Sequence, residues 1–241
     1  MQTNKPVVLV TGASSGIGEA IANKLVTEGY KVYGTSRRGA SSGQYPFPML
    51  ALDVTDDASV AAAIEQLLQK EGRIDVLVNN AGFGIAPVAA EESSIEQAKV
   101  LFDTNFLGVV RMTHAVVPQM RRQGSGRIIN MSSILGVVPM PYAALYVASK
   151  HAVEGLTKTA ALEGAAHGVR VNAVAPGPVE TGMLDRFAGS PDNKAGLLAV
   201  VPAQRAASAD EIAQTIVFVA SNQSPYLTGQ SIAVDGGFTT Q

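Results

Sequence analysis

The chain has 241 residues, of which 46% are hydrophobic and 16% are charged. This length and composition predict one domain with a large buried core and exclude a mainly disordered chain. Eighteen basic against twenty acidic residues give a formal net charge of −2, without the basic excess of nucleic-acid-binding proteins. The absence of cysteine excludes disulfides, thiolate zinc sites and cysteine nucleophiles.

The other composition signals concern metals and membranes. The sequence has three histidines, His114, His151 and His167. No two of them are close enough in sequence to bind a metal from successive turns of one helix, so we expect no histidine metal site. No apolar run approaches the ~18 residues of a membrane span, and the first residues lack the charged start and long apolar stretch of a secretory signal. We therefore expect a cytoplasmic protein that binds neither a membrane nor nucleic acid.

Short apolar runs rich in β-branched residues alternate with longer helical patterns along the chain. The predicted strands are Val7–Val10, Lys31–Thr35, Met49–Leu52, Val76–Val78, Arg127–Met131, Arg170–Ala175 and Ser231–Val234. The predicted helices are Ile17–Glu28, Ala58–Lys70, Ile95–Arg122, Tyr146–Ala166 and Ala209–Ser221. This alternation predicts an α/β fold: a Rossmann-type, doubly wound, seven-stranded parallel sheet with helices on both faces, in a single domain spanning 1–241.

Local signals refine these bounds. Gly29 and Gly72 follow two predicted helices, where glycine commonly ends a helix, and Asp57 or Ser59 is expected to cap the second helix. Residues 181–207 lack clear periodicity, so they form either an ordinary connection or a mobile substrate-binding flap. We favour the flap, because this segment follows the carboxyl end of the sixth strand, where ligands bind in such folds.

A glycine-rich turn follows the first strand and opens the first helix. Its spacing is G-x-x-x-G-x-G, which differs from the G-x-G-x-x-G of the commonest dinucleotide fold. Glycine there permits a tight turn, close approach of backbone to a pyrophosphate and packing of helix on strand, while the free helix N–H groups face the anion. The strand–loop–helix setting predicts a dinucleotide site formed by Gly12, Ser14, Ser15, Gly16, Ile17 and Gly18.

The end of the second strand indicates which dinucleotide binds. NAD sites usually place an acid there to accept from the ribose hydroxyl, but this strand ends in Ser36, Arg37 and Arg38. Guanidinium groups suit a 2′-phosphate because they offer charge and a fixed fork of donors; the alternative is a solvated basic turn. We therefore expect NADP(H) as the preferred cofactor and NAD(H) as an alternative.

Two further turns follow the third and fourth strands. Asp53 and Val54 come after the third strand, where a carboxylate either accepts from the adenine amino group or merely forms a turn. Asn79, Ala81 and Gly82 follow the fourth strand, and their small neighbours let backbone pass close to a cofactor, although alone they indicate only a turn. We expect all five residues at the cofactor site.

Ser133, Tyr146 and Lys150 are the most informative group. Ser133 follows the fifth strand, and Tyr146 and Lys150 lie four residues apart on the next helix, so their side chains share one face. With these residues the chain resembles the short-chain dehydrogenase/reductase family, in its single-domain type of about 250 residues. The resemblance extends over nearly the whole chain and consists of Thr11-Gly12-x3-Gly16-Ile17-Gly18, Asn79-Asn80-Ala81-Gly82, Asn105, Ser133, Tyr146-x3-Lys150, Pro176-Gly177 and Thr181.

The resemblance implies a role for each site residue. Tyr146 donates the proton in carbonyl reduction and accepts it in alcohol oxidation, and Ser133 polarises the substrate oxygen. Asn105 holds a water that links Lys150 to solvent, and Lys150 also binds the nicotinamide ribose. The segment expected to seat the nicotinamide carboxamide contains Pro176, Gly177, Val179 and Thr181.

Simple electrostatics supports the pairing of Tyr146 with Lys150. A free phenol titrates near pH ~10, too high for proton transfer near neutrality. An ammonium ~4 Å away at an effective dielectric of ~20 contributes roughly 4 kcal/mol, or about three pKa units. We therefore expect Lys150, helped by a cationic oxidised nicotinamide, to lower the pKa of Tyr146.

Several activities fit this resemblance. The first is reversible, NADP(H)-dependent reduction of a ketone or aldehyde; 3-oxoacyl-thioester reduction is the nearest alternative, and a catalytically silent regulator is a third. The Tyr-x3-Lys spacing argues against enoyl-thioester chemistry. Ser15 stands where NADP-preferring relatives often carry a basic residue, which weakens the NADP prediction. Arg121 and Arg122 are candidates for docking an acidic acyl carrier, but cations favour a helix end anyway.

The expected substrate pocket lies between residues 134–142 and the flap. The apolar side chains there are Leu135, Val137, Val138, Met140, Met183, Leu184, Phe187, Leu197 and Leu198. We therefore expect an apolar or bulky carbonyl substrate; otherwise these side chains simply pack together. Asp235–Phe238 resembles the family's tail, which commonly packs at a subunit interface, and implies a homotetramer.

Overall fold

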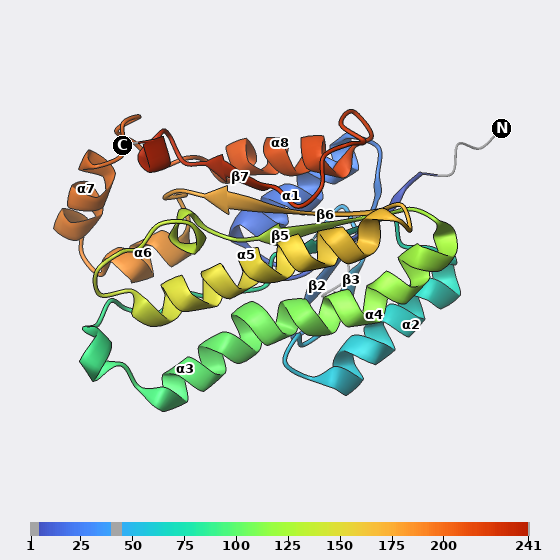
Figure 1. The fold of residues 1–241 in the computed structure, drawn as a ribbon, viewed down its shortest axis with the longest axis horizontal. Coiled ribbons are helices and arrows are strands. Elements are labelled where there is room, and N and C mark those ends of the chain that lie inside the picture. Colours follow the sequence, from blue (N-terminus) through green and yellow to red (C-terminus); the bar gives the residue numbers. More distant parts are fainter. Residues whose placement is uncertain (1–4, 40–44, 241) are drawn as a thin grey trace.

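The computed structural model describes residues 5–39 and 45–240, which form one open, doubly wound sheet with its helices. The seven strands are all parallel, in the order β3-β2-β1-β4-β5-β6-β7 (Figure 1). They are β1 (Val7–Val10), β2 (Lys31–Ser36), β3 (Met49–Ala51), β4 (Val76–Asn79), β5 (Gly126–Met131), β6 (Val169–Pro176) and β7 (Ser231–Val234). The predicted fold and all its strands are confirmed, with no strand end displaced by more than one residue.

The strand order changes direction between β1 and β4. From β1 the chain adds β2 and β3 on one side, and from β4 onward it adds strands on the other side. In doubly wound sheets such a switch point opens a crevice at the carboxyl ends of the strands, where ligands bind. Both central strands are buried at every position, as expected where helices cover both faces.

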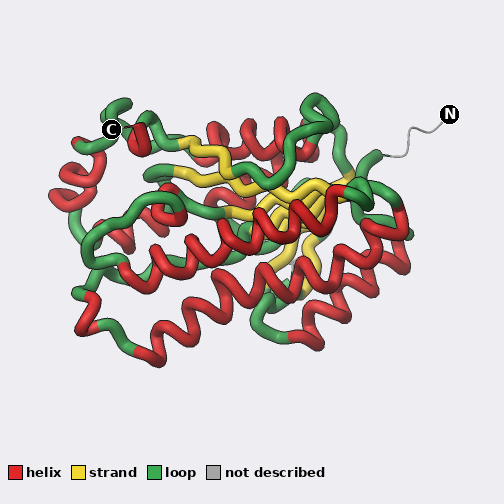
Figure 2. Tube along the Cα trace, viewed as in Figure 1, coloured by secondary structure: helices red, strands yellow, loops and turns green. Residues whose placement is uncertain are grey.

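Helices cover the two faces of the sheet (Figure 2). The five helices that pack on it are α1 (Gly16–Thr27), α2 (Asp57–Glu71), α4 (Gly108–Gln123), α5 (Ala144–Ala165) and α8 (Ala209–Ala220). One apolar cluster joins a face of the sheet to α2, α4 and α5, and a second joins the other face to α1 and α8. Within residues 5–39 and 45–240, no helix is both long and apolar enough to cross a bilayer.

The helix predicted over 95–122 is interrupted. It consists of α3 (Ile95–Phe102), a π-helical turn (Asp103–Leu107) and α4. Such turns are rare and frequently lie at functional sites. The apolar pattern continues through the turn, so periodicity alone predicted a single helix.

Residues 181–207 contain two short helices rather than an irregular segment. These are α6 (Gly182–Ala188) and α7 (Pro191–Ala199). Lys194 of α7 pairs with Glu180 and, at 2.9 Å, with Asp185 of α6, so it braces the two helices. Helices of seven and nine residues are too short for a helical period to stand out in the sequence.

The predicted cap of α2 is wrong. Asp56, not Asp57 or Ser59, has the extended backbone of a cap, and its side chain accepts from the N–H groups of Ala58 and Ser59. Asp57 and Ser59 lie inside the helix, where a side chain cannot accept from the first free N–H groups. Gly72 ends the same helix in the left-handed region, with a φ of 70°, as predicted.

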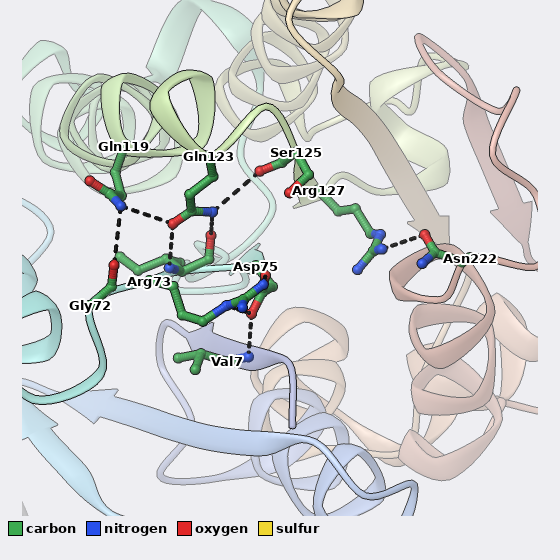
Figure 3. Close-up of polar contacts among 10 residues, drawn as sticks. Val7, Gly72, Arg73, Asp75, Gln119, Gln123, Ser125, Arg127 and Asn222 are labelled. Carbon is green, nitrogen blue, oxygen red and sulfur yellow. Dashed lines mark hydrogen bonds and ion pairs between the residues drawn. The ribbon is translucent and has the colours of Figure 1, made fainter. Parts of the chain in front are cut away.

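A polar cluster holds the amino-terminal ends of two central strands (Figure 3). The buried Asp75 carboxylate accepts from the Val7 N–H at 2.7 Å and from Arg73 Nε at 2.9 Å. The Gln123 amide, at the end of α4, accepts from the Ile74 N–H at 3.0 Å and donates to the Ile74 carbonyl at 2.9 Å. These bonds tie the starts of β1 and β4 to the last turn of α4.

The same geometry places Arg121 and Arg122. Both lie in the last turn of α4, beside the amino-terminal edge and therefore opposite the crevice. Arg121 donates to the Glu163 carbonyl near the end of α5, and Arg122 donates to Gln119 one turn earlier. Within a single chain these arginines do not flank the crevice, so the acyl-carrier docking role considered for them has no support in the fold.

We predict that Asp75→Ala lowers the free energy of unfolding by about 1–3 kcal/mol, because it leaves the buried Val7 N–H and the Arg73 guanidinium without their acceptor. Urea denaturation of both proteins measures the change. Glu96→Ala removes an exposed ion pair with Lys99 and, as the matched control, should have little effect. Equal losses in the two variants would contradict the prediction.

Candidate active site

Two cavities meet at the carboxyl ends of the strands. The larger, about 910 Å³, is lined by the loop after β1, the ends of β2, β3 and β4, and the start of α6. The smaller, about 160 Å³, is lined by the ends of β5 and β6, by α5 and α6, and by Phe238. The residues common to both walls are Ile17, Asn80, Gly82, Phe83, Thr181 and Met183. A ligand that crosses this junction can therefore occupy both cavities.

The glycine loop forms one wall of the larger cavity. Gly12 and Gly16 have φ values of 66° and 59°, in the left-handed region that favours glycine. A Cβ at Gly18 would lie 2.2 Å from the Gly12 carbonyl oxygen, so no larger residue fits there. Because α1 begins at Gly16, its free N–H groups face this space, and a pyrophosphate fits it. The loop residues predicted for the cofactor all line the cavity: Gly12, Ser14, Ser15, Gly16, Ile17 and Gly18.

Asn80 and Thr11 hold the glycine loop against the loop after β4. The Thr11 hydroxyl accepts from the N–H groups of Asn80 at 2.9 Å and Ala81 at 3.0 Å. The Asn80 side chain donates back to the carbonyls of Thr11 and Gly12, at 2.9 and 3.1 Å. Asn80 belongs to the Asn79-Asn80-Ala81-Gly82 motif, but the sequence did not predict it as a site residue. Its position directly after a buried strand could have indicated that it lies at the site.

Asn79 lies outside both cavity walls, in contrast to Ala81 and Gly82. Its side chain is buried and donates to Asn130 Oδ1 at 2.9 Å, and Asn130 donates in turn to the Thr157 hydroxyl at 2.9 Å. As the last residue of β4, Asn79 points into the layer between sheet and α5. Its expected contact with the cofactor is therefore not available to the side chain, whereas Ala81 and Gly82 line the larger cavity.

The far end of the larger cavity is lined by Ser36, Arg37, Asp53 and Val54. Arg38 is exposed and lies outside this wall. The Asp53 carboxylate accepts from the N–H and the hydroxyl of Thr55, at 2.9 and 2.8 Å. These two bonds, and more weakly the charge of Arg37, lower the pKa of Asp53. Asp53 is thus an ionised acceptor near a guanidinium, a setting that suits the adenosine end of a dinucleotide.

Ser133, Tyr146 and Lys150 come together in the wall of the smaller cavity. Ser133 follows β5 with extended backbone, and its hydroxyl accepts from the Leu135 N–H at 3.2 Å. Tyr146 and Lys150 lie one turn apart on α5. The Lys150 ammonium is buried, donates to the Met131 carbonyl at 2.8 Å and stands 5.7 Å from the centroid of the Tyr146 ring.

Burial moves the pKa values of these two groups in opposite directions. It raises the pKa of Tyr146 to about 12, against the opposing effect of a hydrogen bond from Ser133. It lowers the pKa of Lys150 to about 8, and the nearby Glu154 carboxylate partly offsets this shift. In the protein alone, the effect of burial on the pKa of Tyr146 therefore outweighs the lowering expected from Lys150, whose ammonium donates to the Met131 carbonyl and not to the phenol.

Asn105 lies in the π-helical turn and is buried. Its Oδ1 accepts from the Phe83 N–H at 3.0 Å, and its Nδ2 donates to the Phe83 carbonyl at 2.9 Å and to the Ser149 hydroxyl at 3.4 Å. The side chain thus fixes Phe83 at the junction of the two cavities. Both ends of this amide are thus engaged with protein groups, and the water expected at Asn105 stays a prediction.

The segment after β6, which is predicted to seat the nicotinamide carboxamide, reaches the junction of the two cavities. Pro176, Gly177, Val179 and Thr181 all line the smaller cavity, and Thr181 also lines the larger one. A Cβ at Gly177 would lie 2.9 Å from the Asp235 Cα, so the segment passes directly against the C-terminal turn. Val179 pairs with Ala207 in an isolated bridge, which joins the two ends of the 181–207 segment.

The rest of the smaller cavity is apolar. Of the predicted pocket residues, its wall contains Leu135, Met140, Met183, Leu184, Phe187 and Leu197, but not Val137, Val138 or Leu198. Phe238 also lines this cavity, and the subunit interface expected for its turn stays a prediction. Asp235 accepts from the N–H groups of Gly237 and Thr239, both at 2.9 Å, and so holds the short helix that carries Phe238. The Asp-Gly-Gly turn was the sequence signal for this closure.

Comparisons with known proteins agree with this geometry. A family model described as "Enoyl-(Acyl carrier protein) reductase" matches residues 12–239. The chain is 46% identical over 179 residues to the 3-ketodihydrosphingosine reductase of Bacteroides thetaiotaomicron, across 74% of this chain and 66% of that protein, just under two thirds of its length. It is 40% identical over 237 residues to the 3-oxoacyl-[acyl-carrier-protein] reductase FabG of Salmonella typhimurium, across 96% of each chain.

Solved structures show the same similarity. "ElxO with NADP Bound" has a TM-score of 0.91 at 34% identity, covering 98% of this chain and 100% of that one. The 3-ketoacyl-(acyl-carrier-protein) reductase from Brucella melitensis complexed with NADH has a TM-score of 0.91 at 32% identity, with the same coverage. The family match, the relatives and the paired cavities lead to one conclusion: the chain belongs to the short-chain dehydrogenase/reductase family and is an NAD(P)-dependent oxidoreductase.

Proposed function

We propose that the protein reversibly reduces a ketone or aldehyde with NADP(H). The observation that carries this proposal is the position of Ser133, Tyr146 and Lys150 in the smaller cavity, beside its junction with the larger one. A nicotinamide dinucleotide bound across the junction supplies the hydride chemistry. The chain's own side chains orient the carbonyl and move its proton.

The walls of the larger cavity suit NADP(H) better than NAD(H). The glycine loop offers N–H groups to the pyrophosphate, and Ser36 and Arg37 offer donors to a 2′-phosphate. Asp53 offers an acceptor to the adenine amino group. The end of β2 carries no acid to bind the ribose hydroxyls of NAD, and Ser15 supplies no extra positive charge. Similar solved structures are named as complexes with NADP and with NADH, which supports NADP(H) as the preferred cofactor and NAD(H) as the alternative.

Each catalytic side chain has a distinct task. In reduction, the Tyr146 O–H bond breaks and the proton passes to the carbonyl oxygen, while the carbonyl carbon receives the hydride. The Ser133 hydroxyl donates to the same oxygen and polarises it. The charge of Lys150 stabilises the tyrosinate that remains and offers a donor to the nicotinamide ribose. Alcohol oxidation follows the same steps in reverse.

The apolar wall favours an apolar or bulky carbonyl substrate. A 3-oxoacyl thioester is the alternative, and the relatives named as 3-oxoacyl reductases favour it. A silent regulator has the least support, since all three catalytic residues are present and adjoin one cavity. The homotetramer and the cytoplasmic location remain predictions from the family resemblance, and light scattering of the purified protein tests the tetramer.

We predict that Tyr146→Phe lowers carbonyl reduction about 10²–10⁴-fold, because the ring remains while the proton donor is lost. The assay follows NADPH and NADH consumption with an acetoacetyl thioester, an aryl ketone, a bulky cyclic ketone and a sugar aldehyde. Tyr142→Phe is the matched control, since Tyr142 is 65% exposed. Full activity of Tyr146→Phe would refute the role of Tyr146, and preference for the thioester would favour the alternative substrate.

The second prediction concerns pH. Reduction should be present below pH 8 and lost as the pH rises through about 8, because Lys150, with a pKa of about 8, loses its charge there. Tyr146, with a pKa of about 12, keeps its proton over this range. Glu154→Gln removes the charge that raises the pKa of Lys150, so the loss should move to lower pH. The measurement is kcat/KM against pH, which reports groups of the free enzyme.

Ser231→Ala is the control for this shift. It removes the hydrogen bond from the Ser231 hydroxyl to Glu154, 2.8 Å long, but leaves the carboxylate in place. Its pH profile should therefore match that of the unchanged protein. Identical profiles for Glu154→Gln and the unchanged protein would show that Glu154 does not act on Lys150.

The third prediction concerns cofactor choice. Arg37→Gln should weaken NADPH binding about tenfold and leave NADH binding unchanged, because a charge-assisted contact to the 2′-phosphate is lost. Arg38→Gln should have a smaller effect, since Arg38 lies outside the cavity wall. Fluorescence titration with each dinucleotide measures both. If Arg37→Gln weakened both dinucleotides equally, the 2′-phosphate assignment would be wrong.

A further inference from the structure

We infer that Arg186, on helix α6, binds the pyrophosphate of the dinucleotide from the side opposite the glycine loop. The inference rests on the proposed dinucleotide function and adds to it a phosphate contact carried by the 181–207 flap. Arg186 lines the larger cavity together with Gly16 and Ile17 of the glycine loop and with Thr181 and Gly182 at the start of α6. One cavity wall thus joins the flap to the predicted phosphate site.

The side chain of Arg186 folds back toward the start of its own helix, as long side chains commonly do in helices. A Cβ at Gly182 would lie 3.4 Å from the Arg186 Nη1. A Cβ at Gly16 would lie 3.7 Å from the Thr181 Cγ2. The guanidinium therefore stands over Gly182, and the adjacent Thr181 faces the glycine whose neighbouring N–H groups suit a phosphate.

The charge of Arg186 is available for a ligand. Among the residues that the structure describes, Arg186 is exposed and has no ion pair or hydrogen bond. The acids next to it on the flap, Glu180 and Asp185, both pair with Lys194. Asp103, an acid in the same cavity wall, pairs with Arg111 at 2.7 Å.

Among the described residues, Arg37 and Arg186 are the cations of this wall without an ion pair, and they have different targets. Arg37 lies at the end of β2 with Asp53, at the adenosine end of the cavity, while Arg186 lies by Gly16, at the start of α1. A pyrophosphate carries two negative charges, and the glycine loop offers only neutral N–H donors. Arg186 supplies the missing charge, and its planar fork suits two phosphate oxygens.

This contact links cofactor binding to the substrate cavity. The same helix α6 carries Met183, Leu184 and Phe187, all of which line the smaller cavity. A phosphate held by Arg186 therefore fixes the helix that forms the substrate wall.

The experiment compares dissociation constants for NADPH and NADH by fluorescence titration. Because the pyrophosphate is common to both, Arg186→Gln should weaken both about tenfold and by the same factor. Arg37→Gln should weaken NADPH alone. Arg186→Lys should keep part of the affinity, since the charge remains while the fork is lost. Arg122→Gln removes a charge at the opposite edge of the sheet and is the matched control, with no expected change.

A second readout follows the flap directly. Saturating NADPH should slow backbone hydrogen exchange over residues 182–199 in the unchanged protein, and should slow it much less in Arg186→Gln. Unchanged affinities in Arg186→Gln, or weakening of NADPH alone, would overturn the inference. If the unchanged protein bound neither dinucleotide, the proposed function itself would fail, and the inference with it.

Discussion

The loops that follow β1 and β4 are in direct contact, and both cavities are built around this contact. A Cβ at Gly12 would lie 3.0 Å from the Ala81 Cα, and the Thr11 hydroxyl accepts from two N–H groups of the opposite loop. Because the strand order reverses between these strands, the crevice opens where the two loops touch. A larger residue at Gly12 would part the loops and move the glycine loop away from the smaller cavity, which Ser133, Tyr146 and Lys150 line.

Burial is the second physical factor, and it sets the resting protonation of the site. It raises the pKa of Tyr146 above the usual value of a phenol and lowers the pKa of Lys150 below the usual value of an ammonium group. At neutral pH the phenol keeps its proton and the lysine keeps its charge, which is the state that the proposed carbonyl reduction requires. Oxidation needs a tyrosinate, and the positive charge of an oxidised nicotinamide favours that form.

Several positions of the site depended on contacts that motif spacing does not encode. Asn79 and Asn80 are neighbours in one motif, yet the end of β4 turns Asn79 into the interior and leaves Asn80 to brace the glycine loop. The sequence assigned Phe238 only to a C-terminal tail, whereas the bonds of Asp235 also place it in the wall of the smaller cavity. Arg186 belonged to no motif, because the role proposed for it depends on α6 lining the same cavity as the glycine loop.

The sequence by itself determined the sheet, its strands, the glycine loop and the trio Ser133, Tyr146 and Lys150. These features are local: a strand shows as an apolar run, and a helix places residues four apart on one face. Only the tertiary structure decided the π-helical turn, the two helices within residues 181–207, the bond of Lys150 to Met131 and the burial that shifts the pKa values of Tyr146 and Lys150. Each of these depends on which distant groups share a buried space, and neither composition nor periodicity records that.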